Sequence, residues 1–105
     1  MLGKMGRRVA FLGGISNGEL GNRLADALRA EGVSLDAVHR SDAPTTLSLV
    51  GVDARGVPEY AFYGTGAADR TLPLAALRRM PAQARLLHVG SYTMVVGETA
   101  ATQRA

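Results

Sequence analysis

The first third of the chain runs from a strand through a tight turn to a helix and a second strand, and this order most constrains the fold. Residues 9–12 are an uninterrupted apolar run stopped by Gly13 and Gly14, which is typical of a strand covered on both faces. Residues 19–31 have helical periodicity, and residues 33–38 form the next apolar segment. The order predicts a parallel β-α-β layer and therefore an α/β protein.

The helical segment is expected to be amphipathic. Leu20, Leu24 and Leu28 recur every fourth residue, so they form one stripe that we expect to pack against the sheet. Gly32 stands where a left-handed residue ends many helices. Asn17, just before the segment, has the chemistry of a turn or a helix cap.

Residues 45–63 are expected to form an antiparallel hairpin. Residues 45–52 are rich in β-branched side chains and alternate in polarity, residues 53–56 have turn composition, and residues 59–63 predict the second strand. Their mixed polarity suggests one packed face and one open face.

The last third of the chain predicts shorter elements. We expect a short helix around residues 73–80, a covered strand at residues 85–90, and the first turns of a helix at the end of the sequence. His88 within that strand is expected to be a hydrogen-bonded histidine of the core or of a sheet face. Because so few helices cannot cover both faces of a parallel sheet, the chain is expected to oligomerise or to be part of a larger fold.

Composition excludes several classes of function. The chain of 105 residues has no Cys and only two His, which excludes disulfides and cysteine nucleophiles and argues against a zinc site. Its net charge of +3 is spread without a basic run, so we expect no nucleic-acid partner. No apolar run is long enough for a membrane span or a signal peptide, and a cytoplasmic location is expected.

Three stretches, taken in order, resemble a known family. Residues 4–33, with their strand, turn and helix ending in Gly-Val, look like its first matching segment. Residues 43–69, with the Phe-Tyr pair and a Gly-Ala-Ala-Asp sequence, look like a lid hairpin that covers a sugar, and residues 87–91 look like the strand that follows. The whole resembles the fructokinase-like branch of the PfkB (ribokinase-like) carbohydrate kinases.

The resemblance implies a partial ribokinase-like fold over residues 1–105, with a protruding lid hairpin at about residues 45–63. Family members are roughly three times as long, and two of their segments have no counterpart in this sequence. One is a Gly-Gly/Asn sugar-binding segment; the other is a Gly-Ala-Gly-Asp segment that carries the general base and the anion hole. We therefore expect no catalytic residue here, and ATP and Mg²⁺, which the family uses, are not expected to bind this chain tightly.

Two interpretations of the function follow. The chain is either a fragment of an ATP-dependent sugar kinase, inactive alone, or a non-catalytic lid or dimerisation module, including the remnant of a truncated gene. A homodimer through the hairpin is expected because lids of this family commonly pair across an interface and because the hairpin edges are open.

The resemblance also suggests four sugar-binding residues. Phe62 and Tyr63 lie on the second hairpin strand, and because they alternate between faces only one can meet the sugar; the alternative is that they fill a packed face. Gly64 stands where sugar-acid kinases of the family often carry Arg, which favours a neutral sugar such as fructose. Ser91 and Tyr92 follow the expected strand at its carboxyl end, where they could bind sugar or pack a loop.

Overall fold

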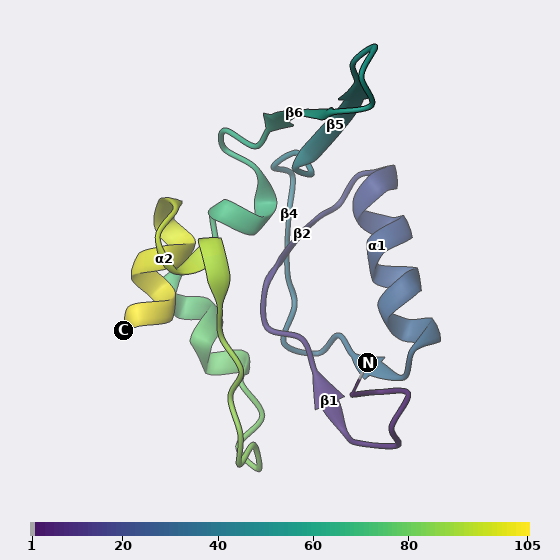
Figure 1. Ribbon diagram of the computed structural model, residues 1–105. Coiled ribbons are helices and arrows are strands. Elements are labelled where there is room, and N and C mark those ends of the chain that lie inside the picture. Colours follow the sequence, from purple (N-terminus) through teal and green to yellow (C-terminus); the bar gives the residue numbers. More distant parts are fainter. Residues whose placement is uncertain (1) are drawn as a thin grey trace.

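The computed structural model describes residues 2–105, apart from the side chain of Tyr92. Helix α1 and two parallel strand pairs make up one side of the molecule, and short helices with the C-terminal helix α2 make up the other. A hairpin, β5–β6, projects away from both sides (Figure 1). The molecule is elongated, with extents of 51 × 30 × 25 Å.

The predicted parallel β-α-β layer is confirmed. Strand β1 (Val9–Ala10) pairs in parallel with β3 (Val33–Ser34), and β2 (Gly14–Ser16) pairs in parallel with β4 (His39–Ser41). Helix α1 (Glu19–Ala30) connects the two halves of this layer. The connection returns the chain in the same direction, as a β-α-β crossover must.

The strand expected at residues 9–12 is present but shorter, and the expectation that both of its faces are covered is wrong. The chain forms β1, which ends at Ala10, and then β2 after three intervening residues. Phe11 still continues the ladder, since its N–H donates to the carbonyl oxygen of Ser34 at 3.0 Å, but its side chain is 38% exposed. Within the described residues each parallel sheet has only two strands. No described element therefore covers both faces of the apolar run at residues 9–12.

Helix α1 lies where it was predicted, but it buries a different stripe. Leu20 and Leu24 are 48% and 50% exposed, while Gly21 and Ala25 are buried. The reason is a close approach of backbones: a Cβ added at Gly21 would lie 1.9 Å from the carbonyl oxygen of Ser16. Because Gly21 and Ala25 have small side chains, α1 packs closely against the end of β2. Leu20 and Leu24 therefore lie beside the contact and not within it.

The sequence predicts the C-terminal end of α1 correctly but not the residue that caps its N-terminal end. Gly32 adopts the expected left-handed conformation, with φ +75°. At the other end Gly18 is the N-cap, and no side chain caps the helix. Asn17 acts in the turn instead, because its Nδ2 donates to Asp42 Oδ1 at 3.0 Å.

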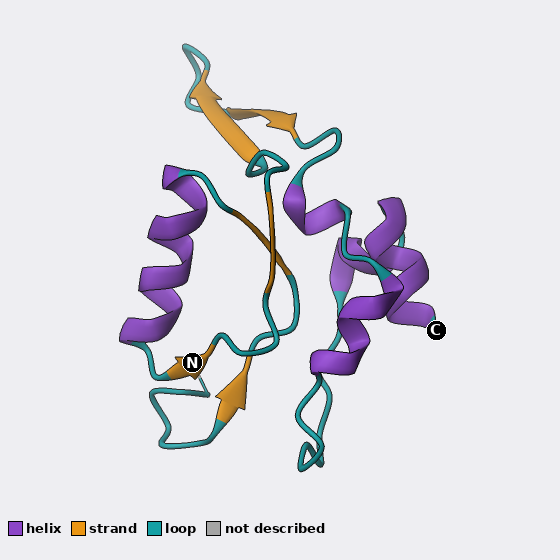
Figure 2. Ribbon diagram, turned by 180° about the vertical axis from the view of Figure 1, so that it is seen from behind, coloured by secondary structure: helices purple, strands orange, loops and turns teal. Residues whose placement is uncertain are grey.

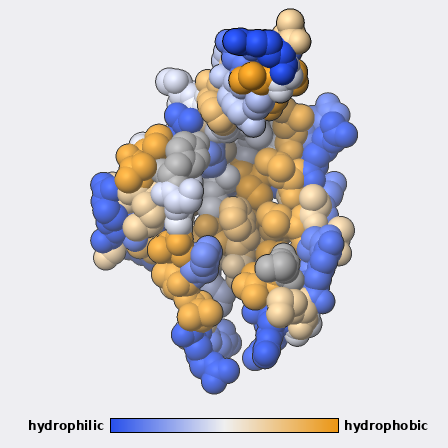
Figure 3. All heavy atoms as spheres, viewed as in Figure 1, coloured by the Kyte–Doolittle hydropathy of each residue, from blue (hydrophilic) through white to orange (hydrophobic). Residues whose placement is uncertain are grey.

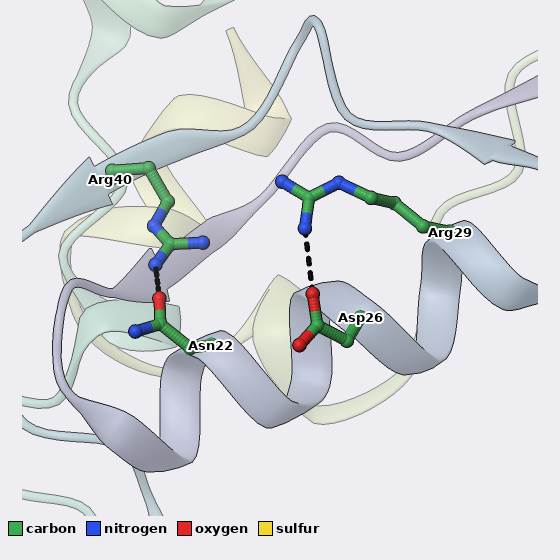
Figure 4. Close-up of polar contacts among 4 residues, drawn as sticks. All are labelled: Asn22, Asp26, Arg29 and Arg40. Atoms are coloured by element: carbon green, nitrogen blue, oxygen red, sulfur yellow. Dashed lines mark hydrogen bonds and ion pairs between the residues drawn. The ribbon is translucent and has the colours of Figure 1, made fainter.

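Two polar contacts lie along the outer face of α1 (Figure 4). Arg40 of β4 donates through Nη2 to Asn22 Oδ1 and so ties the strand to the helix. Arg29 donates through Nη1 to Asp26 Oδ1 at 2.8 Å, one turn earlier. Both contacts are exposed, and exposed pairs of this kind add little to stability.

The predicted hairpin is confirmed, whereas its expected packed face is not. Strands β5 (Leu47–Val52) and β6 (Pro58–Tyr63) pair antiparallel, and all their residues are exposed. The Asp53 carboxylate accepts the N–H groups of Arg55 and Val57, at 2.8 and 3.0 Å, and so builds the turn. Figure 2 shows from behind that the hairpin extends beyond the other elements, which is why neither of its faces is covered.

Short helices make up most of the remaining chain. They are η1 (Ala68–Arg70), η2 (Leu74–Arg79), η3 (Ser91–Met94) and α2 (Gly97–Arg104). The helix expected around residues 73–80 is present as the 3₁₀ helix η2, and the helix expected at the end of the sequence is α2. No helix of the described residues is long and apolar enough to cross a membrane.

The strand expected at residues 85–90 is wrong. This segment is irregular and exposed: Leu86 is 87% exposed, Leu87 is 60% exposed, and His88, expected in the core or on a sheet face, is exposed as well. A strand requires a hydrogen-bonding neighbour, and no described strand pairs with this segment. An apolar run alone therefore did not produce a strand.

The core is small and consists mainly of alanine. Leu72, at 1% exposure, is the largest fully buried side chain among the described residues. Ile15 and Val38, both 4% exposed, pack on the β2–β4 side. Many larger apolar side chains lie at the surface instead, and Figure 3 shows them gathered on the face between α1 and the short helices.

Candidate functional site

A pocket of about 200 Å³ lies where β2 ends and the hairpin begins. Ligands of open α/β sheets gather at the carboxyl ends of parallel strands, and this pocket occupies such a place. It is smaller than the roughly 300–1,000 Å³ of a typical small-molecule site. Its lining comes from β2, α1, the hairpin root and η1: Gly14, Ile15, Ser16, Leu24, Thr45, Thr46, Ala68 and Asp69.

The polar groups of the pocket are hydroxyls and one carboxylate. Ser16 is 6% exposed, and its Oγ accepts the N–H of Gly18 at 3.1 Å. Thr46 donates through Oγ1 to the carboxylate of Asp69. Hydroxyl and carboxylate oxygens can exchange hydrogen bonds with the hydroxyls of a neutral polyol.

A glycine allows the two walls of the pocket to meet. The carbonyl oxygen of Ala68, in η1, would lie 1.9 Å from a Cβ at Gly14. Any other residue at this position would push η1 away from β2. Gly14 therefore sets the width of the pocket.

The structure separates the two aromatic residues predicted to bind sugar. Phe62 is paired with Ser48 and Tyr63 with Leu47, so their side chains lie on opposite faces of the hairpin, as expected. Phe62 is 67% exposed and Tyr63 is 60% exposed, and neither lines the pocket. The ring of Phe62 stacks on Tyr60, with centroids 6.1 Å apart.

The other two predicted residues are not brought to the pocket by any described contact. Ser91 begins η3 with φ 61° and is exposed. The strand that was expected to place it at a sheet edge is absent from the described residues. The side chain of Tyr92 lies outside the described part of the chain.

A basic side chain occupies the space beside Gly64. Gly64 is buried, and a Cβ added there would lie 2.5 Å from Nη2 of Arg70. The space beside Gly64 is therefore charged, because the guanidinium of Arg70, the last residue of η1, lies there. Sequence reasoning considered position 64 alone and missed this contribution, because it depends on η1 folding back to the end of β6.

Sequence reasoning also missed the residues that line the pocket. Ser16, Thr45 and Thr46 carry no motif of their own. The Gly-Ala-Ala-Asp sequence that ends at Asp69 was part of the resemblance, but no role was assigned to it. The available signal was position: Thr45 and Thr46 begin the predicted hairpin, and Ser16 lies in the turn between the first predicted strand and the helix.

The described residues hold no cluster of potential metal ligands. Within residues 2–105 no group of three or more His, Asp or Glu residues could hold a metal ion. The sequence also has no phosphate-binding glycine loop of the kind that cradles a nucleotide.

Comparison with known proteins agrees with this description. The family described as pfkB family carbohydrate kinase matches residues 1–104. The chain is 34% identical over 95 residues to Fructokinase-2 of Solanum habrochaites, a match that covers 89% of this chain and 29% of the relative. The chain thus spans about 29% of the length of that curated relative.

Solved structures show the same partial coverage. A fructokinase from Xylella fastidiosa matches with a TM-score of 0.88 and 27% identity, over 97% of this chain and 33% of that one. A structure of fructokinase with bound ATP from the same organism matches with a TM-score of 0.67 and 28% identity, over 71% of this chain and 24% of that one. The expected partial ribokinase-like fold is confirmed.

Proposed function

Because this chain belongs to the pfkB family of carbohydrate kinases, we propose that it is the part of a fructokinase-like enzyme that covers the sugar. The complete reaction would transfer the γ-phosphoryl group of ATP to a hydroxyl of a fructose-like sugar. The similar proteins are named fructokinases, and one was solved with bound ATP. This chain corresponds to about a third of such a protein.

The observation that carries the proposal is the position of the pocket. It lies at the carboxyl end of β2, and the residues that begin the hairpin form one of its walls. A segment that projects from this edge can close over a ligand and exclude water, which is a common requirement of phosphoryl transfer. The hydroxyls of Ser16 and Thr45 and the carboxylate of Asp69 suit a polyol.

We propose that the chain has no kinase activity on its own. Phosphoryl transfer depends on groups that hold the phosphates and neutralise developing charge, and the described residues offer neither a metal cluster nor a glycine loop. ATP and Mg²⁺ would be held by other parts of a complete kinase domain. The residues of this chain would orient the sugar and shield it from water.

A phosphorylation assay tests this division of labour. The purified chain is incubated with ATP, Mg²⁺ and either fructose or ribose, and sugar phosphate is measured alongside nucleotide binding. We expect no turnover and no tight binding of nucleotide. Turnover by the chain alone would contradict the proposal that the catalytic groups lie elsewhere.

A binding measurement tests the assignment of the sugar site. Fructose is titrated into the chain, and perturbed amides are mapped by NMR. We expect the perturbations to centre on Ser16, Thr46 and Asp69. Neither Phe62 nor Tyr63 lines the pocket, so either ring would reach the sugar only when the hairpin closes over it. Because the two side chains lie on opposite hairpin faces, only one of the variants Phe62→Ala and Tyr63→Ala should weaken binding. Perturbations confined to regions remote from the pocket would contradict the assignment.

A second candidate function is favoured by the exposure of the hairpin. Val50, Val52 and Phe62 share one face and are 57%, 68% and 67% exposed, while Leu49 on the other face is 52% exposed. Monomeric proteins seldom expose so contiguous an apolar area. We propose that a second copy of the chain covers one of these faces, which would make the hairpin a dimerisation module whether or not the chain takes part in catalysis.

Sedimentation at micromolar concentration tests the dimer. The double variant Val50→Thr, Phe62→Ser removes apolar area from one face, and Arg55→Ser at the turn is the matched control. We expect the parent chain and the control to associate and the double variant to sediment as a monomer. A compact monomer for the parent chain would exclude the module.

A further inference from the structure

Two buried threonine hydroxyls connect α2 to the segment that holds the hairpin. Thr99 and Thr102 lie one turn apart on α2, and each is 3% exposed. Thr99 Oγ1 donates to the carbonyl oxygen of Asp69 at 2.7 Å and accepts the N–H of Leu72 at 2.9 Å. Thr102 Oγ1 donates to the carbonyl oxygen of Leu72 at 2.7 Å. Three backbone polar groups of residues 69–72, the carbonyl oxygens of Asp69 and Leu72 and the N–H of Leu72, are thus satisfied by side chains of α2.

Residues 68 and 69 of this region also form hydrogen bonds to residues 44 and 46, which precede the hairpin. The N–H of Ala68 donates to the carbonyl oxygen of Pro44 at 2.8 Å, and the carboxylate of Asp69 accepts the hydroxyl of Thr46. Pro44 and Thr46 stand immediately before β5, which begins at Leu47. In Figure 1 η1 lies between α2 and the hairpin. A continuous chain of hydrogen bonds therefore runs from α2 through η1 to the place where the hairpin leaves the body of the molecule.

We propose that Thr99 and Thr102 are positioning residues that set the orientation of the hairpin by fixing residues 68–72. They act through the Ala68 amide and the Asp69 carboxylate and touch no ligand themselves. The importance of that orientation for sugar binding rests on the proposed function, whereas the coupling from α2 to the hairpin root does not. Buried hydroxyls suit this role because their hydrogen bonds are directional and an unpaired partner is costly.

Hydrogen exchange in the whole chain tests the coupling. Thr99→Val keeps the shape of the side chain and removes the hydroxyl that bonds to the carbonyl oxygen of Asp69 and to the N–H of Leu72. We expect the Ala68 amide, which is bonded to Pro44, to exchange about tenfold faster or more. The amide of His39, bonded to Gly13 at 2.9 Å in the β2–β4 layer, should keep its protection.

Two further variants separate positioning from loss of packing. Thr99→Ser restores the hydroxyl and should restore the protection of Ala68. Thr93→Val removes a hydroxyl that bonds to Gly90 and Gln103, without a bond to η1, and should leave Ala68 unchanged. If Thr99→Val does not fold, Thr102→Val, which loses a single bond, gives the same comparison with a smaller effect.

The outcomes decide the proposal without reference to sugar. Faster exchange at Ala68 with an unchanged His39, reversed by Thr99→Ser, supports it. An unchanged Ala68, or equal acceleration of Ala68 and His39, overturns it, because the threonines would then act locally or on global stability. No sugar or nucleotide is present, so a failed fructose titration would count against the proposed function and not against this coupling.

Discussion

At the scale of single residues, glycines decide how closely the elements of this chain approach one another. Gly21 is the third residue of helix α1, and within a helix alanine is normally preferred over glycine by about 1 kcal/mol. Its position against the carbonyl oxygen of Ser16 reverses that preference, since a Cβ would lie 1.9 Å from the oxygen. Gly14 likewise allows β2 and η1 to approach closely, because a Cβ there would lie 1.9 Å from the carbonyl oxygen of Ala68. Helix propensity alone would have predicted the opposite sign at Gly21.

The variant Gly21→Ala is therefore expected to destabilise the chain, by about 1–3 kcal/mol, as overpacking does. Urea unfolding followed by circular dichroism measures the change. Gly51→Ala is the matched control, because a Cβ there meets nothing within 4 Å and its φ is not positive. A variant at Gly21 as stable as the parent chain would mean that α1 does not rest on the Ser16 carbonyl.

At the scale of elements, helix α1 has a wider apolar stripe than this part of the chain covers. Gly21 and Ala25 contact the sheet, while Leu20 and Leu24 stand beside them, half exposed. An apolar stripe of this width is typical of a helix that packs against more than one neighbouring element. The partial match to fructokinases agrees with that pattern, because about two thirds of the solved relative lies outside the match.

The variant Leu20→Gln should change the free energy of unfolding by less than about 0.5 kcal/mol, the usual range for surface positions. Ala25→Gln, at 0% exposure, should destabilise the chain by several kcal/mol, because it buries a large polar side chain in a filled space. Thermal unfolding of the two variants makes the comparison. A large loss of stability for Leu20→Gln would show that the leucine is packed in solution, for example against a second copy.

At the scale of the whole molecule, apolar surface outweighs charge. The chain has a net charge of +3 and three exposed ion pairs among the described residues, whereas its large exposed apolar side chains include Leu47, Val52, Leu86 and Val95. Exposed ion pairs contribute little and are screened by salt. Contact with other copies should therefore be driven by burial of apolar area.

Self-association of the whole chain is accordingly expected to persist when salt is raised from about 0.1 to 1 M, although the Debye length falls from about 10 to 3 Å. Sedimentation at the two salt concentrations provides the measurement, and binding of an apolar dye should decrease as the chain associates. Dissociation at high salt would instead indicate an interface built from charges.

Much of the local structure could be read from the sequence. The α1 helix, the Gly32 helix end and the β5–β6 hairpin follow from periodicity and turn chemistry, which are properties of neighbouring residues. The family was suggested by a separate signal, the resemblance of three segments that keep their order along the chain, and the family match confirms it. The pocket was not predicted, since Ser16, Thr46 and Asp69 meet only after the chain has folded.

The tertiary structure alone decided which surfaces are buried. An apolar pattern indicates that a residue can be buried, but it does not identify the segment that buries it. Residues 85–90 are irregular because no described strand pairs with them. On α1, Gly21 and Ala25 are buried, whereas Leu20 and Leu24 are exposed. The link from Thr99 to the hairpin root has no signature in the sequence, because it joins residues 30 positions apart. Local patterns follow from short-range sterics, whereas burial and long-range hydrogen bonds depend on which segments the fold brings together.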